Sequence, residues 1–344
     1  MPTIVAHTRQ YPPHRWIGAE LATHELLKYL AGRGWDCYVR VSEASEMGMR
    51  PGDNAVSYEG VLVAADWLHN LPRADVVLHS TVGYDVAVEQ AKRDGALRAM
   101  WLHGGFSSWQ ADRINEAQPD LVVYNSHSQQ RGIGHLVSAP STVLHPPVPA
   151  GDWMVGQIRP PWRGGKVTLI NTTDGKGAQT FYDLAAHMPM TEFLAVGGGH
   201  GQQIEPPDLP NLEFRPHGTD MAQVWRDTAV LLMPSVTESW GMVAVEAMHR
   251  GIPVIGSDIP GLSECLGWSA NGTMFDAAMP LVQLQDATFG PWAWAAVLRN
   301  VLADWSTWSA RALARSDQLD PAPELAEFET LLRLHLSERK GTLV

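Results

Sequence analysis

The sequence predicts an α/β protein with two doubly wound domains, each a parallel sheet with helices on both faces, that face each other across a cleft. Three observations support this fold class. Short apolar runs alternate with amphipathic stretches, the runs are almost continuously hydrophobic, and a Pro- and Gly-rich segment interrupts the alternation near mid-chain. A length of 344 residues is about twice that of a typical domain.

The first domain is expected within residues 1–150. Its apolar runs predict strands at 3–8, 37–41, 60–64, 75–79, 97–102 and 121–124. The clearest helix spans 19–31, where leucines recur near helical spacing and Gly32 and Gly34 follow. Strand and helix therefore alternate as in β-α units.

An interdomain linker is predicted at residues 143–163, because its prolines lack a backbone donor and its Pro and Gly density disfavours regular structure. The second domain, 151–320, has strands at 166–170, 193–196, 212–214, 229–233 and 253–256, and helices at 178–187, 221–226 and 243–250. The tail from 292 to 336 is helical in pattern with interruptions at Pro321 and Pro323. We expect a C-terminal helix within 321–344 to pack back on the first domain.

Composition excludes several classes of protein. The net charge is −12, and neither half of the chain is basic, which disfavours a protein that coats nucleic acid. Cys37 and Cys265 are too few for a disulfide framework or a four-ligand zinc site, and fit a reducing cytoplasm. No cationic leader precedes an apolar run, and no 18 consecutive residues are apolar, so we expect a soluble chain without stable membrane insertion.

The most informative stretch is residues 234–248, where an apolar strand gives way to a polar loop with Glu238 and then to a helix starting near Trp240. Backbone N–H groups around residues 241–243 are free at that helix start and suit a phosphate. Glu246 lies on the apolar stripe of the helix, where an ionised carboxylate is costly unless ligand hydroxyls bind it. The alternative is that Glu238 caps the helix and Glu246 is a solvated surface acid.

The spacing of these two glutamates carries a resemblance. Glu238 and Glu246 stand eight residues apart, after Pro-Ser and before Gly-Ile-Pro-Val, which resembles the Glu-x7-Glu signature of retaining, nucleotide-sugar-dependent glycosyltransferases of the GT-B fold, particularly the large family 4 (glycosyl transferases group 1). Other stretches similar to this family follow in the same order, namely Ile17-Gly18-Ala19-Glu20, Trp101-Leu102-His103-Gly104, Asn125-Ser126, Lys176-Gly177, Val196-Gly197-Gly198-Gly199 and the loop 257–262. The resemblance covers about residues 3 to 275 and implies two Rossmann-like domains.

The resemblance also implies an activity, which is transfer of a sugar from a UDP- or GDP-sugar to an acceptor hydroxyl with retention, without a metal or a permanently bound cofactor. Glu246 would bind the ribose hydroxyls, Glu238 the hydroxyls of the transferred sugar, and Lys176 the diphosphate, while His103 would hydrogen-bond the sugar near its anomeric centre. Further donor contacts are expected at Gly18, Asn171, Gly198, Ser239, Trp240, Gly241, Met242 and Val243. As alternatives, His103 could be a structural histidine and Lys176 a solvated lysine.

One departure from the family concerns the diphosphate site. The family usually has an Arg about five residues before the lysine, whereas this chain has Asn171. Either Lys176 and helix N-termini suffice, or Arg131, Arg9 or Arg15 compensates. The sequence contains no Asp-x-Asp, which argues against a divalent-metal clamp on the diphosphate.

The acceptor is expected on the first domain, where residues 9–16 offer cations, aromatic rings and a Pro pair. We expect contacts from Arg9, Tyr11, Arg15 and Trp16, although the segment could be an ordinary mobile rim. A glycan, a small molecule or a protein could be the acceptor, and the charge count disfavours modified DNA. Two alternative functions remain open, a degenerate sugar-nucleotide-binding protein, which the missing Arg makes plausible, and a sugar-nucleotide epimerase.

Overall fold

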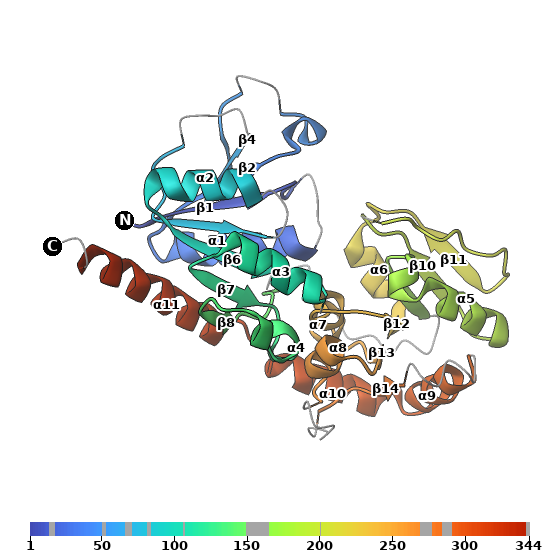
Figure 1. Ribbon diagram of the computed structural model, residues 1–344. Helices are drawn as coiled ribbons and strands as arrows, with labels where there is room; N and C mark the ends of the chain where they lie inside the picture. The colour runs from blue at the N-terminus through green and yellow to red at the C-terminus, as the bar shows by residue number, and fades with distance from the viewer. Residues whose placement is uncertain are drawn as a thin grey trace. The chain divides into compact units, whose positions relative to one another are not determined.

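The computed structural model describes residues 1–13, 18–49, 53–65, 71–80, 84–105, 107–148, 165–199, 201–268, 277–283 and 291–341 (Figure 1). The chain divides into two compact units. Unit 1 comprises Met1–Val148 and Pro321–Val344, and unit 2 comprises Pro149–Asp320.

Unit 1 is built on an eight-stranded sheet in the order β3-β4-β2-β1-β5-β6-β7-β8. Its strands are β1 (Thr3–Thr8), β2 (Asp36–Val41), β3 (Val56–Tyr58), β4 (Val61–Ala65), β5 (Val76–His79), β6 (Leu97–Leu102), β7 (Leu121–Tyr124) and β8 (Ser141–Val143). Neighbours are parallel except β3 and β4, whose antiparallel pairing was not predicted. β5, β6 and β7 are almost entirely buried, which explains why they appear in the sequence as continuous apolar runs.

Helices cover the sheet of unit 1. They are α1 (Gly18–Gly32), α2 (Tyr84–Asp94), α3 (Ser108–Ala117), α4 (His127–Ile133) and α11 (Ala322–Gly341), with short 3-10 turns η1 (Ala44–Met47) and η2 (Gly134–Leu136). α1 packs on β2 and β4, and α2 packs on β5 and β6. α11 comes from the far end of the sequence and lies beside α1 (Figure 1).

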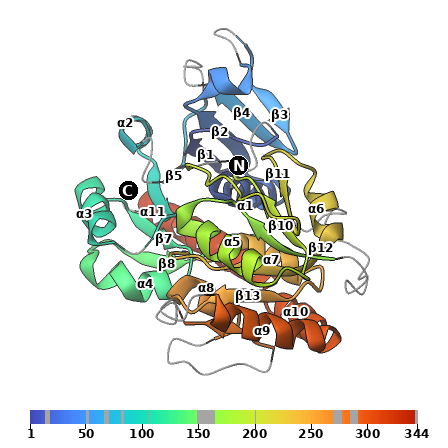
Figure 2. The same ribbon diagram turned by 90° about the vertical axis from the view of Figure 1, so that its right-hand side faces the viewer.

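Unit 2 is built on a six-stranded parallel sheet in the order β11-β10-β9-β12-β13-β14. Its strands are β9 (Lys166–Ile170), β10 (Phe193–Val196), β11 (Leu212–Arg215), β12 (Thr228–Met233), β13 (Val254–Ser257) and β14 (Leu281–Val282). Its helices are α5 (Ala178–His187), α6 (Met221–Asp227), α7 (Met242–Met248), α8 (Pro260–Cys265), α9 (Trp292–Ala303) and α10 (Trp305–Asp317), with the 3-10 turn η3 (Asp174–Lys176). Figure 2 shows α8, α9 and α10 gathered near β13.

The tryptophans of the tail contribute mainly to the core of unit 2. Trp294 and Trp305 are buried in a cluster with Phe181 and Phe193, and the Trp305 indole donates to the Ala229 carbonyl at 2.8 Å. Trp292 is exposed. Trp294 and Trp305 are therefore packing residues of this core.

Most predicted elements agree with the structure to within two residues at each end. Two differences concern proline and the linker. Pro323 does not interrupt a helix but lies in the first turn of α11, where the missing N–H has no intrahelical partner to lose. Val143 belongs to β8 rather than to the predicted linker, most of which (149–164) lies outside the described residues.

The two sheets confirm the predicted α/β class. In unit 2, β10, β9, β12 and β13 are adjacent and parallel, so the loops that follow them emerge at the same edge of the sheet. This edge, where open α/β sheets bind ligands, holds the candidate site.

Candidate active site

The loop after β9 begins and ends with a residue that has a left-handed backbone conformation. Asn171 has φ 73° and Gly177 has φ 76°, and η3 lies between them. Only glycine fits at 177, because a Cβ there would lie 2.1 Å from the Pro234 carbonyl oxygen. The Val236 N–H also donates to the Gly175 carbonyl at 3.0 Å. The loops after β9 and β12 are therefore held against each other.

This contact brings the predicted diphosphate cation to the predicted sugar-binding carboxylate. Lys176 Nζ forms an ion pair with Glu238 Oε1, and the Ser235 hydroxyl donates to the same oxygen at 3.2 Å. The Lys176 side chain is 28% exposed and the Glu238 side chain 10% exposed. Neither is a freely solvated surface group, and Glu238 does not act as a helix cap. The pair therefore places a partly desolvated cation and carboxylate together at the carboxyl edge of the sheet.

Glu246 is buried in α7, one turn before Arg250, and is not the surface acid of the alternative interpretation. Burial raises the pKa of its carboxyl from 4.5 to about 7, and the charge of Arg250 opposes this rise. The Arg250 guanidinium donates to the Glu246 main-chain carbonyl at 3.3 Å and lies 5.7 Å from the Trp225 ring centroid. Within the described part of the chain, no group donates a hydrogen bond to the Glu246 carboxylate. A ligand with hydroxyl donors would satisfy it.

The turn into α7 exposes backbone donors. Gly241 has φ 120° and precedes the helix, whose first N–H groups, those of Met242 and Val243, have no intrahelical acceptor. Ser239 is half-buried and Trp240 is buried. The start of α8 fixes this turn from behind, because a Cβ on Gly261 would lie 2.3 Å from the Glu238 carbonyl oxygen.

Asn171 and Gly198 pack on each other between β9 and β10. A Cβ on Gly198 would lie 2.3 Å from Asn171 Cγ and Oδ1, so the glycine permits this close approach. The Asn171 side chain is buried, and its Oδ1 accepts from Gln203 Nε2 at 3.1 Å. Asn171 is thus engaged inside the fold. Gln203 was not predicted, because no spacing or motif in the sequence marks a single glutamine in a loop.

His103 follows β6 in unit 1. Its ring lies 4.6 Å from that of Trp101, centroid to centroid, and burial lowers its pKa to about 3, so the imidazole is neutral near pH 7. The following turn is fixed by Gln129, whose amide donates to the Gly104 carbonyl at 2.8 Å. Gly18 is exposed at the start of α1. A neutral histidine at this strand end can exchange hydrogen bonds with a hydroxyl.

The residues predicted to bind the acceptor have different environments. The Arg9 guanidinium donates to Glu43 Oε1 at 2.6 Å. Tyr11 has no exposed surface, and its hydroxyl lies 2.9 Å from His24 Nδ1, so its side chain is part of the core of unit 1. Arg15 and Trp16 lie outside the described residues. Arg131, a candidate second cation, donates to the Ser128 hydroxyl at 3.0 Å.

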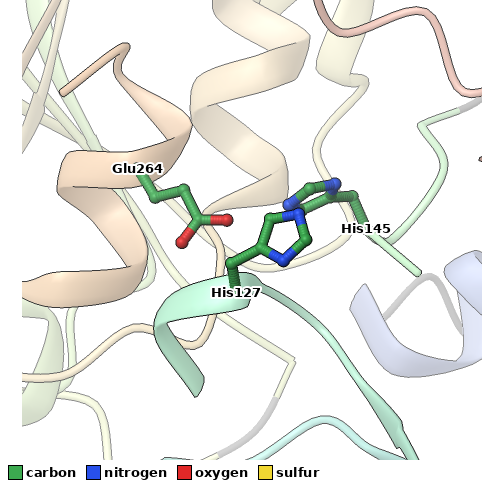
Figure 3. A group of neighbouring side chains, drawn as sticks. All are labelled: His127, His145 and Glu264. Atoms are coloured by element: carbon green, nitrogen blue, oxygen red, sulfur yellow. The ribbon is translucent and has the colours of Figure 1, made fainter. Parts of the chain in front are cut away.

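Two histidines of unit 1 lie side by side, one at the start of α4 and one just after β8. Figure 3 shows His127, at the start of α4, beside His145, and their ring centroids are 5.6 Å apart. His145 Nδ1 lies 2.7 Å from Glu324 Oε1, and the His145 N–H donates to Glu324 Oε2 at 3.0 Å. Figure 3 also labels Glu264, a residue of unit 2. His145 thus anchors the start of α11 within unit 1.

Comparison with solved structures defines the class of fold. The chain is similar to sucrose-phosphate synthase from Thermosynechococcus elongatus, with 17% identity, a TM-score of 0.74 and coverage of 98% of this chain and 100% of that one. It is also similar to HepE from Anabaena, solved in complex with UDP and glucose (15% identity, TM-score 0.69, 97% and 100% covered). A third similar structure is the trehalose-phosphate synthase of Burkholderia xenovorans, with 12% identity, a TM-score of 0.64 and coverage of 97% of this chain and 99% of that one. The fold is that of the GT-B glycosyltransferases, as predicted.

Comparison at the level of sequence finds similarity to one family over part of the chain. Residues 173–287 match the sequence model of the family described as Glycosyl transferases group 1, which confirms the resemblance over that part of the chain. D-inositol 3-phosphate glycosyltransferase of Nocardia farcinica is 29% identical over 179 residues, 47% of this chain and 36% of that protein. The same enzyme of Mycobacterium leprae is 29% identical over 185 residues, 47% of this chain and 43% of that protein. The chain thus spans less than half the length of these two relatives.

The matched segment contains Lys176, Gly198, Glu238 and Glu246, whereas Asn171 and His103 precede it. The match thus covers the loops after β10 and β12 of unit 2. Among the described residues, no helix combines the length and the apolar character needed to cross a bilayer.

Proposed function

We propose that this chain is a glycosyltransferase that moves a sugar from a nucleotide-diphosphate sugar to an acceptor hydroxyl with retention of anomeric configuration and without a metal ion. Unit 2 would bind the donor and unit 1 the acceptor. The free thiols of Cys37 and Cys265 are buried, which is compatible with work in the cytoplasm.

The observation that carries the proposal is the Lys176–Glu238 pair at the carboxyl edge of the sheet, together with the buried Glu246 nearby in sequence. A sugar diphosphate offers a partner for each charge, because its diphosphate is anionic and its sugar hydroxyls donate. Lys176 would turn to the diphosphate and Glu238 to the sugar, while the carboxylate of Glu246 would accept from the ribose hydroxyls. Each partly desolvated group would then be matched.

Backbone donors would supplement Lys176 at the diphosphate. The N–H groups of Trp240, Gly241 and Met242 precede or begin α7, where the helix dipole favours an anion. The loop of Ser239 and Val243, the Gly198 turn and Asn171 would form the rest of the donor wall. UDP was found with glucose in HepE, which supports a UDP-sugar as the first donor to test, with a GDP-sugar second.

Retention without a covalent intermediate fits the placement of the carboxylates. Glu238 is engaged by Lys176 and Ser235 and would bind sugar hydroxyls, so it is not positioned as a free nucleophile. We infer a front-face transfer, in which the bond from the anomeric carbon to the diphosphate oxygen breaks as the acceptor oxygen bonds to that carbon. The acceptor proton passes to the leaving phosphate oxygen. In unit 1, neutral His103 would hydrogen-bond the sugar near its anomeric centre, and Gly18 would contact the donor.

Thermal-shift measurements with UDP-, GDP-, ADP- and TDP-sugars and their nucleotides test the donor site, since a ligand that binds only the folded state stabilises it. We expect one nucleotide series to raise the melting temperature and Lys176→Met to reduce that rise. Lys166→Met is the matched control, because Lys166 pairs with Glu213 at the start of β9, away from the site edge. An equal loss in both variants, or no shift with any nucleotide at millimolar concentration, would contradict the proposal.

Transfer itself is tested by incubating the stabilising donor with candidate acceptors and following release of the nucleoside diphosphate. Glu238→Gln should lower the rate strongly and leave no glycosyl group on the protein, as measured by intact-protein mass spectrometry. A covalent glycosyl adduct on any carboxylate would refute the front-face mechanism.

A further inference from the structure

The Gln203 side chain makes several hydrogen bonds at the edge of the candidate site. Its Oε1 accepts from the Gly198 N–H at 2.7 Å and from both the N–H and the hydroxyl of Thr172 at 3.0 Å. Its Nε2 donates to Asn171 Oδ1 at 3.1 Å and to the Gly201 carbonyl at 3.3 Å. One neutral amide therefore joins the end of β9, the turn after β10 and its own loop.

The connection continues toward Lys176. Gln203 forms an isolated antiparallel bridge with Thr173, and the next residue, Ile204, donates its N–H to the Thr172 carbonyl at 2.7 Å. The Thr173 carbonyl in turn accepts the N–H groups of Lys176 at 3.1 Å and Ala178 at 3.3 Å, which closes η3 and starts α5. The main chain that carries Lys176 thus rests on the segment that Gln203 holds.

The packing leaves little room for another arrangement. A Cβ on Gly201 would lie 2.9 Å from Thr173 Cγ2, and one on Gly198 would overlap Asn171. The Tyr182 hydroxyl donates to the Ile204 carbonyl at 2.9 Å and fixes the far side of the segment. An amide suits this position because it both donates and accepts, which neither an alkyl chain nor a carboxylate does.

We infer that Gln203 is a positioning residue for the diphosphate-binding part of the donor site, an inference that rests on the proposed function. It fixes the position of the Gly198 turn relative to the Lys176 loop, so that the backbone of the turn and the lysine side chain can bind the phosphates at the same time. The nucleoside end of the donor, assigned to Glu246 on α7, does not depend on this network. Loss of Gln203 therefore weakens binding of a nucleoside diphosphate far more than binding of the nucleoside.

The test compares the dissociation constants of a nucleoside diphosphate and its parent nucleoside by titration calorimetry, with UDP and uridine as probes, or GDP and guanosine if the thermal-shift panel selects them. In Gln203→Met we expect the ratio of the two affinities to fall about tenfold, the effect of one lost hydrogen-bonded contact. The nucleoside alone should bind nearly as in the wild type.

Asn211→Leu is the matched control for general destabilisation. The Asn211 amide donates to the Ala185, Met188 and Thr191 carbonyls at 2.9 to 3.1 Å, directly before β11 and so at the opposite edge of the sheet. This variant should lower the melting temperature but preserve the affinity ratio. Should Gln203→Met fail to fold, Thr172→Val removes one of its bonds and should shift the ratio the same way by a smaller factor.

The outcomes separate the two proposals. An affinity ratio that is unchanged in the Gln203 and Thr172 variants, or that falls equally in Asn211→Leu, overturns the positioning role and leaves the proposed function intact. Wild-type protein that binds no nucleoside diphosphate overturns the proposed function itself.

Discussion

The carboxyl group of Glu246 should give the stability of unit 2 a distinctive pH dependence. Its pKa is about 7 in the folded chain against 4.5 when exposed. Between these two pH values the carboxyl is protonated in the folded state and ionised in the unfolded state. Stability therefore falls as pH rises from about 4.5 to 7. We expect the stability of Glu246→Gln, relative to the wild type, to rise by roughly 3 kcal/mol between pH 4 and pH 8.

Urea unfolding of the two proteins across this range measures the difference in stability. A constant gap between the curves would mean that the Glu246 carboxyl has the same pKa in the folded and unfolded chains. Nucleotide affinity supplies a second readout, since ribose hydroxyls bind the ionised carboxylate, and wild-type affinity should weaken below pH 7 while that of Glu246→Gln should not.

Individual site residues differ in how far the sequence reveals them. Glu238 and Glu246 were predicted from the strand-loop-helix pattern and their spacing, and Lys176 from the resemblance of Lys176-Gly177 to the family's Lys-Gly pair. The structure places Lys176 and Glu238 in contact. Tyr11 was assigned to a binding rim because residues 9–16 look polar and aromatic, yet its ring is buried. Gln203 carries no sequence signal, because its partners are main-chain groups brought together only by folding.

At the scale of elements, buried parallel strands were predicted well because each is a short apolar run ended by polar or turn residues. β1, β6, β7, β9 and β10 agree with their predicted bounds. Among the strands, those without a predicted range are short, as in β3, β8 and β14. The helices α2, α3, α4 and α8 were also given no range. Sequence periodicity thus defines the interior of each sheet better than its rim.

The loop between β9 and α5 should tolerate change at one glycine and not at its neighbour. Gly177→Ala would force a side chain into a left-handed backbone and against the Pro234 carbonyl oxygen, 2.1 Å away. We expect a loss of at least about 2 kcal/mol of unfolding free energy. Gly175→Ala, where a Cβ meets nothing within 4 Å, should be close to neutral. Chemical denaturation of both variants checks this, and a loss in Gly177→Ala no larger than that in Gly175→Ala would contradict the close approach of Gly177 to Pro234.

At the scale of the whole molecule, α11 completes unit 1 from the far end of the sequence. Glu329 is almost fully buried and accepts from Arg33 at 3.1 Å, Trp35 at 3.2 Å and Arg333 at 2.8 Å. These hydrogen bonds, with the charge of Arg333, lower the pKa of its carboxyl despite the opposing effect of burial. Unit 1 is therefore assembled from two separate segments of the chain.

Two leucines of α11 test its contribution to unit 1. Leu332 is completely buried and Leu334 is 57% exposed on the same helix. Leu332→Ala should cost about 2–5 kcal/mol, and Leu334→Ala should cost less than about 0.5 kcal/mol. Scanning calorimetry with and without a stabilising nucleotide measures this loss of stability. In Leu332→Ala the nucleotide should still raise the melting temperature of unit 2 as in the wild type. Equal effects of the two substitutions would indicate that α11 does not pack on the amino-terminal segment of unit 1.

The division of unit 1 into Met1–Val148 and Pro321–Val344 has a consequence for biosynthesis. A ribosome that has finished residue 148 must add all of unit 2 before α11 exists, which takes about 10 to 40 s at roughly 5–20 residues per second. During that interval the nascent amino-terminal sheet lacks the helix that covers Trp35 and the flank of α1. Unit 2, contiguous in sequence, can fold first, and the amino-terminal segment must avoid aggregation, alone or with a chaperone, until the last helix is made.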